Sequence, residues 1–259
     1  MGQRVMNLTL NENEKIIKQL NGFSGSSVYL LQDDKKIFVR KVNNIERNFE
    51  RMTELLSLGY NIPQIYFKNE NILDIEYIPG FDIKTYLKFN QIDKLVKFLI
   101  TTIRSLASES KNKDYSKIYE DKLSNIDFNY LPFDKHQLID KLPCILPQSN
   151  YHGDLTLENI LYGSNQTFYL IDPVTIEYDS WIFDIAKLRQ DLQCKWFIRN
   201  DNVLLDPQLN LIQTKIFEQF PESNNDYLLI LMLLRVYNHA TINSDEHKFL
   251  LGEIYKLWK

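Results

Sequence analysis

Cysteine and basic charge are both scarce in this 259-residue sequence. It has only two cysteines, Cys144 and Cys194, and they show no metal-like spacing, so we expect reduced thiols in a cytoplasmic protein. Its 30 lysines and arginines are outnumbered by 34 aspartates and glutamates, which gives a formal net charge of −4. No basic segment dominates, and this argues against a nucleic-acid partner.

Long apolar segments are absent too. The run Leu228–Leu234 is far shorter than the ~20 residues of a membrane-spanning helix, so we expect no membrane insertion. The first 15 residues lack the apolar core of a signal peptide, and position 6 lacks the Ser or Thr of a myristoylation motif. With 44% hydrophobic and 25% charged residues, the chain is typical of a globular protein with one large domain or two lobes.

The expected secondary structure changes character near Pro79. Before it, short strands are expected over 28–32, 36–42, 63–67 and 72–78, with a helix over 44–59. After it, helices are expected over 82–89, 91–110, 134–142, 182–199, 208–219, 226–239 and 245–258, with an irregular connection over 111–133. The sequence therefore predicts an α+β protein with a small antiparallel-sheet domain (1–79) and a larger, mainly helical domain (80–259).

One short stretch, Y-H-G-D-L-T-L-E-N-I-L-Y at 151–162, places many polar groups against a strand-like run. It continues through a Gly-Ser-Asn turn to L-I-D-P. If the turn is centred between residues 165 and 166, Asn159 lies opposite Asp172, and paired residues of a ladder are roughly 5 Å apart. An amide oxygen and a carboxylate are hard ligands that suit Mg²⁺.

A third polar residue, Asp154, precedes Asn159 by five positions. Protein kinases have the same offset between the catalytic-loop Asp and a metal-binding Asn, followed later by a metal-binding Asp. Taken singly, each of these residues is adequately explained as a turn or cap residue. The combination of His-Gly-Asp, Asn and the later Asp within strand–turn–strand favours phosphoryl transfer.

These motifs, H-G-D-L-T-L-E-N followed by L-I-D, resemble the signature of the aminoglycoside phosphotransferase and choline kinase superfamily. The resemblance implies a two-lobed, protein-kinase-like fold that binds ATP between its lobes. It implies that Asp154 is the catalytic base and that Asn159 and Asp172 hold Mg²⁺. It also implies that His152, and Asp184 in the later D-S-W-I-F-D-I-A-K-L, support the catalytic loop.

A phosphate-covering loop is expected in the small domain. The segment N-G-F-S-G-S-S-V-Y-L contains Gly22, Ser24, Gly25, Ser26 and Ser27 just before a strand, and its amides are suited to face a phosphate. No Gly-Lys-Ser/Thr follows, so this is not a Walker A loop. It resembles the short phosphate-covering loop of the superfamily.

The kinase reaction also needs a cation for the α- and β-phosphates. Arg40 and Lys41 are adjacent on the expected strand, and only one of them can face the nucleotide. Counting along the hairpin favours Lys41, whereas choline-kinase-like members often have Arg in this region. Among three helical glutamates at i, i+4 and i+8 (Glu46, Glu50 and Glu54), Glu50 best matches the family position of its partner.

The segment L-D-I-E-Y-I-P-G resembles the hinge of the family, whose backbone near Glu76 and Ile78 would bind adenine. Pro173 stands where protein kinases have Phe-Gly, and no Ala-Pro-Glu segment follows, so the resemblance is not to a regulated protein kinase. The expected acceptor is therefore a hydroxyl of a small molecule.

The acceptor itself is left open by the sequence. Choline or ethanolamine, a sugar and an amino sugar are all candidates, and the chain loosely resembles kinase-like proteins of bacterial surface-polysaccharide synthesis. The alternatives are an aminoglycoside-modifying kinase, a nucleotide-binding pseudokinase scaffold and an atypical protein kinase. The candidate residues of the acceptor pocket are Tyr178, Trp181, Arg189, Asp191 and Arg235.

Overall fold

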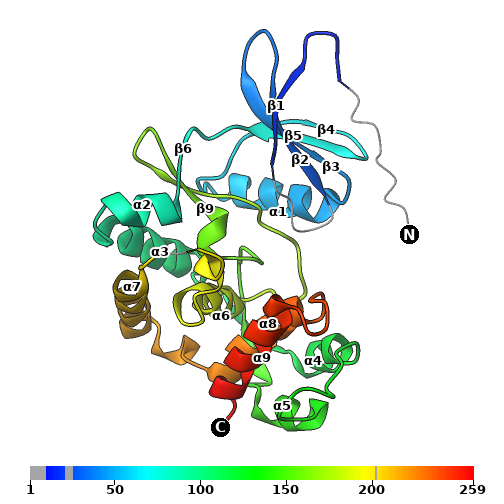
Figure 1. Cartoon of the computed structure of the whole chain (residues 1–259), viewed down its shortest axis with the longest axis vertical. Coiled ribbons are helices and arrows are strands. Elements are labelled where there is room, and N and C mark those ends of the chain that lie inside the picture. Colours follow the sequence, from blue (N-terminus) through cyan, green and yellow to red (C-terminus); the bar gives the residue numbers. More distant parts are fainter. Residues whose placement is uncertain (1–9, 21–25, 202) are drawn as a thin grey trace. The chain divides into compact units, whose positions relative to one another are not determined.

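The computed structural model describes residues 10–20, 26–201 and 203–259 (Figure 1). The chain forms two compact units, one made of residues 1–81 with 161–175 and the other of 82–160 with 176–259. The first boundary lies close to the Pro79 position at which the sequence pattern changes. The sequence did not predict that 161–175 joins the first unit.

Unit 1 is built on a five-stranded antiparallel sheet with the strand order β1-β2-β3-β5-β4 (Figure 1). The predicted hairpin is present because the Asp33 carboxylate accepts hydrogen bonds from the amides of Lys35 and Lys36, which fixes the turn. The elements are β1 (Lys15–Leu20), β2 (Ser27–Gln32), β3 (Ile37–Val42), α1 (Glu46–Ser57), β4 (Ile65–Lys68) and β5 (Ile72–Glu76).

Helix α1 ends where the sequence predicts. Gly59 adopts φ +80°, its amide bonds to Leu56 O, and the amide of Tyr60 bonds to Leu55 O. This is the Schellman arrangement that a glycine after a helix favours. Met52 and Leu55 of α1 are buried, as are Leu31 and Leu73 of the sheet, and they form part of the core of unit 1.

A second, three-stranded sheet follows the order β10-β9-β6. Its strands are β6 (Gly80–Asp82), β9 (Ile160–Gly163) and β10 (Phe168–Leu170). The amide of Gly163 donates to Thr167 O, so the turn is centred on Asn165, half a residue from the predicted centre. Asn159 and Asp172 lie just outside the strands, and the predicted cross-strand pairing of these two residues is therefore wrong.

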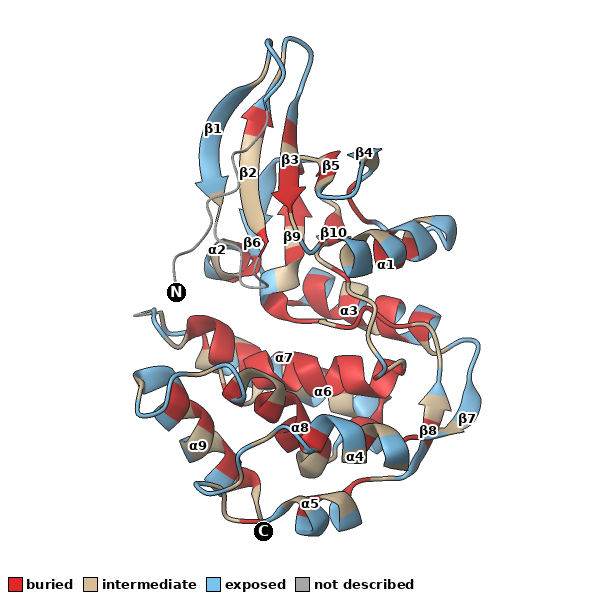
Figure 2. Ribbon diagram, turned by 90° about the vertical axis from the view of Figure 1, so that its right-hand side faces the viewer, coloured by how far each residue is buried: buried red, intermediate tan, exposed pale blue. Residues whose placement is uncertain are grey.

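Unit 2 is mainly helical, as the sequence predicts. Helix α6 is its centre, because all of its residues are buried and it packs against α7 and α8 (Figure 2). The helices are α2 (Ile83–Phe89), α3 (Asp93–Leu106), α4 (Ser116–Leu123), α5 (Lys135–Lys141), α6 (Trp181–Leu192), α7 (Asp206–Gln219), α8 (Asp226–Tyr237) and α9 (Asp245–Leu257), with short 3₁₀ turns at Leu157–Asn159, Trp196–Ile198 and Pro221–Ser223.

Two parts of unit 2 differ from the prediction. The segment 111–133 contains strand β7 (Lys111–Asp114) and helix α4, and β7 pairs with β8 (Ile145–Gln148). The sequence of β7 is polar throughout and lacks the alternation of apolar residues that predicts a strand. Its pairing with β8 is made by backbone groups, which almost any residue type supplies. The helix predicted over 182–199 ends at Leu192, and Lys195 then adopts a left-handed conformation. None of the described helices combines the length and the hydropathy of a membrane span.

Candidate active site

The predicted site residues fall in both units, and each set is described by itself. In unit 2, Asp154 and Asn159 are joined directly. The Asn159 side-chain amide donates to Asp154 O at 2.8 Å and to Asp154 Oδ2 at 3.1 Å. Because its nitrogen is used in this way, the oxygen of the Asn159 amide is the atom available to a cation. The carboxyl of Asp154 is about one-third exposed, as a residue that meets a substrate must be.

The backbone before Asp154 is held by Asp184 of α6. The Asp184 carboxylate accepts from the amide of His152 at 2.5 Å and from the amide of Gly153 at 2.8 Å. His152 and Asp184 are both buried. Hydrogen bonds to a buried carboxylate are the stronger kind, so Asp184 fixes the approach to Asp154. Gly153 has φ +90°, which a residue with a side chain rarely adopts.

Two further residues of α6 contact the same loop. The ammonium of Lys187 lies 3.3 Å from Asp154 Oδ1, and Asp191 Oδ2 accepts from the amide of Leu157 at 2.6 Å. With Asp184 they occupy positions i, i+3 and i+7, which form one face of a helix. Sequence reasoning had not identified Lys187, although this spacing of charged residues within D-I-A-K-L-R-Q-D was a readable signal.

The surroundings of the loop shift the pKa values of Asp154 and Asp191 in opposite directions. Burial raises the pKa of Asp154, but the nearby charges of Lys187, Arg235 and His152 outweigh it, so the pKa is lowered. Burial raises the pKa of Asp191 to about 7, and the neighbouring acid Glu158 adds to that increase. Asp154 is therefore an ionised carboxylate at neutral pH, as a proton acceptor must be.

In unit 1 the two adjacent cations of β3 have different partners. Arg40 is buried and forms paired hydrogen bonds with Asp74, both at 2.7 Å, and with Glu14, at 2.8 and 2.9 Å. Its pKa is raised, first by the hydrogen bonds to Asp74. Lys41 is also buried, and it forms an ion pair with Asp172 instead. These hydrogen bonds of the Arg40 guanidinium are all made within unit 1, and the role of Lys41 in phosphate binding stays a prediction.

Asp172 follows β10 and has φ +56°, and its side chain is 44% exposed. The segment that follows Asp172 is hydrogen-bonded to α1. The side-chain amide of Asn48 donates to Pro173 O at 2.8 Å, and Arg47 Nε donates to Thr175 O at 2.6 Å. These contacts explain why 161–175 belongs to unit 1. They also place a carboxylate on the same unit as the cation of β3.

The glutamates of α1 do not have the predicted arrangement. Glu46 pairs with Lys68, and Glu54 pairs with Arg51. Glu50 is exposed, and none of the ion pairs found within the described residues joins it to Lys41. The expected Lys41–Glu50 pair is therefore replaced by Lys41–Asp172.

Other predicted nucleotide-binding positions are only partly described. Gly22, Ser24 and Gly25 lie outside the described residues. The hydroxyl of Ser26 donates to Asn43 O at 2.8 Å, and Ser27 begins β2. At the predicted hinge, the amide of Glu76 donates to Gln64 O at 2.8 Å, and Ile78 is buried. The roles of these residues stay predictions.

Most of the predicted acceptor residues are not surface groups. Tyr178, Trp181, Arg189 and Asp191 are all buried in unit 2. Arg189 donates to Asn225 O and to Asp226 Oδ1, each at 2.6 Å, and so joins α6 to α8. Arg235 of α8 is half-buried, and its guanidinium lies 3.4 Å from Gly153 O, next to Asp154. Of the five candidates, Arg235 alone combines partial exposure with proximity to Asp154.

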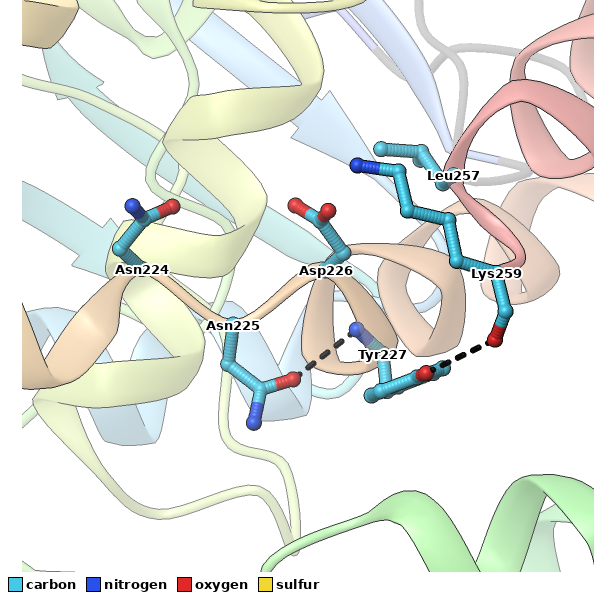
Figure 3. Close-up of a pocket in the computed structure, with 6 residues that line it drawn as sticks. All are labelled: Asn224, Asn225, Asp226, Tyr227, Leu257 and Lys259. Carbon is cyan, nitrogen blue, oxygen red and sulfur yellow. Dashed lines mark hydrogen bonds between the residues drawn. The ribbon is translucent and has the colours of Figure 1, made fainter.

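A surface pocket lies elsewhere in unit 2, between the start of α8 and the end of α9 (Figure 3). It has a volume of about 290 Å³ and is lined by Asn224, Asn225, Asp226, Tyr227, Leu257 and Lys259. Asn225 caps α8, and Asp226 pairs with Arg189, so these two polar residues of the pocket stabilise the fold. This pocket contains none of the predicted site residues.

The two residues predicted to hold Mg²⁺ belong to different units. Asn159 in unit 2 offers an amide oxygen, and Asp172 in unit 1 offers a half-exposed carboxylate; each is a hard oxygen donor of the kind that Mg²⁺ prefers. Within the described part of the chain, no group of three or more His, Cys, Asp or Glu side chains forms a metal site. The metal role of Asn159 and Asp172 stays a prediction.

Solved structures share this fold over nearly the whole chain. Aminoglycoside phosphotransferase APH(4)-Ia has a TM-score of 0.67 at 11% identity, with 94% of this chain and 93% of that chain covered. LicA in complex with AMP has a TM-score of 0.54 at 14% identity, with 96% and 95% covered. The ethanolamine kinase of Plasmodium vivax has a TM-score of 0.51 at 14% identity, with 95% and 82% covered.

Another structure of APH(4)-Ia contains ADP and hygromycin B. No protein-family model and no curated protein sequence matches this chain. The likenesses in structure establish the protein-kinase-like fold and confirm, at the level of fold, the resemblance that the motifs predict.

Proposed function

We propose that this chain, which has the fold of small-molecule kinases, is an ATP- and Mg²⁺-dependent phosphotransferase acting on a hydroxyl of a small molecule. The observation that carries the proposal is the support given to Asp154. Three charged residues of α6 contact its loop, its carboxylate is ionised, and Asn159 is bonded to it. A turn residue without a function does not need such support.

In the proposed reaction, Asp154 accepts the proton of the acceptor hydroxyl as the oxygen attacks the γ-phosphorus. The bond from that phosphorus to the β–γ bridging oxygen breaks, and ADP leaves. Lys41 holds phosphate oxygens, while Asn159 and Asp172 would hold Mg²⁺, which neutralises charge on the phosphates. The contribution of the protein is positioning and electrostatic stabilisation.

The test is ADP release from Mg·ATP against a panel of choline, ethanolamine, neutral sugars, amino sugars, sugar acids and aminoglycosides. Asp154→Asn should abolish acceptor-dependent release and leave Mg·ATP affinity, measured by calorimetry, nearly unchanged. Asp121→Asn, on the exposed surface of α4, is the matched control and should behave as the wild type. Wild-type turnover in the Asp154 variant would disprove the assignment of the base.

The phosphate-binding cation has its own test. Lys41→Met should weaken Mg·ATP binding about 10- to 100-fold, the loss expected when a charge-assisted bond to phosphate is removed. Unchanged nucleotide affinity in this variant would exclude Lys41 from the site.

A further inference from the structure

The charges that surround Asp154 in unit 2 are mainly positive. Lys187 lies 3.3 Å from its carboxylate, and Arg235 approaches the carbonyl of the preceding residue, Gly153. Arg235 also helps to lower the pKa of Asp154, but it forms none of the ion pairs found among the described residues. Its guanidinium contacts are that carbonyl at 3.4 Å, Met232 Sδ at 3.5 Å and the ring of Tyr178, whose centroid is 5.9 Å away. These are weak contacts for a group with five donors.

A polycationic acceptor would need several unpaired carboxylates, and all but one of those described near the loop already have partners. Asp179 accepts from Lys113, Gln148 and Tyr115. The remaining acids of α6, α8 and the segment before α6 are also engaged: Asp184 and Asp191 with loop amides, Asp226 with Arg189, and Glu177 with Lys122. Glu158, the exposed acid of the loop, forms none of the ion pairs found among the described residues; burial raises its pKa, and the nearby charges of Arg199 and Lys84 offset this only in part.

A quaternary amine would need an aromatic cage. Four aromatic residues of α6, α8 and the segments that flank α6 are all buried, with 3–6% of their surfaces exposed: Tyr178, Trp181, Trp196 and Tyr237. They pack against other rings, as Trp181 does against Phe220 and Trp196 against Phe249. These four rings therefore pack in the core of unit 2 and do not form a cage for a ligand.

We propose that the acceptor is an alcohol that carries an anionic group, a carboxylate or a phosphate, and that Arg235 binds this group. This assignment rests on the proposed function. Lys187 is bonded to the base itself, so its charge serves the reacting atoms. Arg235 of α8 contacts the carbonyl of Gly153, the residue before the base, and is half-buried. Its planar guanidinium fits a carboxylate or phosphate in a bidentate manner.

The experiment compares acceptors that share one skeleton and differ in charge: glucose, glucosamine, glucuronate and glucose 6-phosphate, with glycerol, serinol, glycerate and glycerol 3-phosphate as a second set. Transfer is measured as ADP release from Mg·ATP. In at least one set, the highest kcat/KM should belong to an anionic member. Comparing glucuronate and glycerate with the two phosphate esters shows whether the anionic group of the acceptor is a carboxylate or a phosphate.

Arg235→Gln should lower the ratio of kcat/KM for the anionic member to kcat/KM for its neutral counterpart by about 10- to 100-fold. If Arg235 only supported the loop through Gly153 O, both values would fall together and the ratio would stay constant. Arg104→Gln, an exposed arginine of α3 that bonds to Gln219, is the control and should leave the ratio and the rates unchanged.

Three results would overturn the acceptor assignment. They are a preference for the amine in both sets, an unchanged ratio in Arg235→Gln, and no transfer to any anionic member by an enzyme that binds Mg·ATP. Failure of the proposed function is a different result, because Mg·ATP would then neither bind nor be hydrolysed.

Discussion

Asp191 gives a prediction about stability that follows directly from its position. It is fully buried on α6, one oxygen accepts from the amide of Leu157, and the other has no hydrogen-bond partner among the described residues. Replacing it by Asn keeps the acceptor for Leu157 and removes the titrating group. The substitution therefore isolates the free-energy cost of ionising this one buried carboxyl.

The magnitude follows from proton linkage. The pKa of Asp191 is raised from 3.8 to about 7, first by burial, so the folded state binds its proton more tightly than the unfolded state. Stability that depends on this proton is fully present below pH 3.8 and is lost as the pH rises toward about 7. At about 1.4 kcal/mol per pKa unit, the wild type should lose about 4 kcal/mol across this range through Asp191.

The assay is urea unfolding of the wild type and Asp191→Asn at pH values from 4 to 8, followed by tryptophan fluorescence. The two proteins should have similar stabilities at pH 4, and the variant should be more stable by up to about 4 kcal/mol at pH 8. Subtracting the two profiles cancels the contributions of all other titrating groups. A difference that stays constant across this range would refute the reasoning, because Asp191 would then not change its ionisation on folding.

Three other substitutions test the two units separately. Lys187→Met should raise the pKa of Asp154 and move the acid limb of the kcat/KM profile to higher pH, whereas no movement would show that Lys187 does not act on the base. Arg40→Leu should destabilise unit 1 by about 3–5 kcal/mol in urea unfolding, because it removes the cation that pairs with the buried Asp74 and with Glu14, and a loss below about 1 kcal/mol would contradict this. Gly80→Ala would place a Cβ 2.1 Å from Tyr162 O and should cost about 1–3 kcal/mol, and wild-type stability would contradict the close approach of β6 to β9.

The sequence predicted those features that depend on local chemistry. Helix α1 and its end at Gly59 follow from hydrophobic spacing and from the left-handed conformation that glycine permits. The hairpin at Asp33 follows from turn chemistry. The set of Asp154, Asn159 and Asp172 stands out because several residue types occur together at fixed spacing, and a motif keeps its spacing whatever the surrounding fold.

Features that depend on distant partners were not predictable in this way. The ion pair of Lys41 with Asp172 joins residues far apart in the sequence, whereas the resemblance to the family pointed to Glu50 as the partner of Lys41. The same limit applies to the acceptor residues. Residue type alone does not distinguish Arg189 from Arg235. Arg189 is buried and bonds α6 to α8, whereas Arg235 is half-buried. Burial is a property of the assembled unit.

Helix α6 also determines how the loop around Asp154 tolerates change. Side chains of the loop itself hold part of its backbone, but three of its amides depend on Asp184 and Asp191, which come from a later helix. One residue inserted between Asp184 and Asp191 would turn the following part of the helix by about 100° and move one contact off the loop. Insertions in this segment should therefore be far more damaging than insertions in the exposed connections.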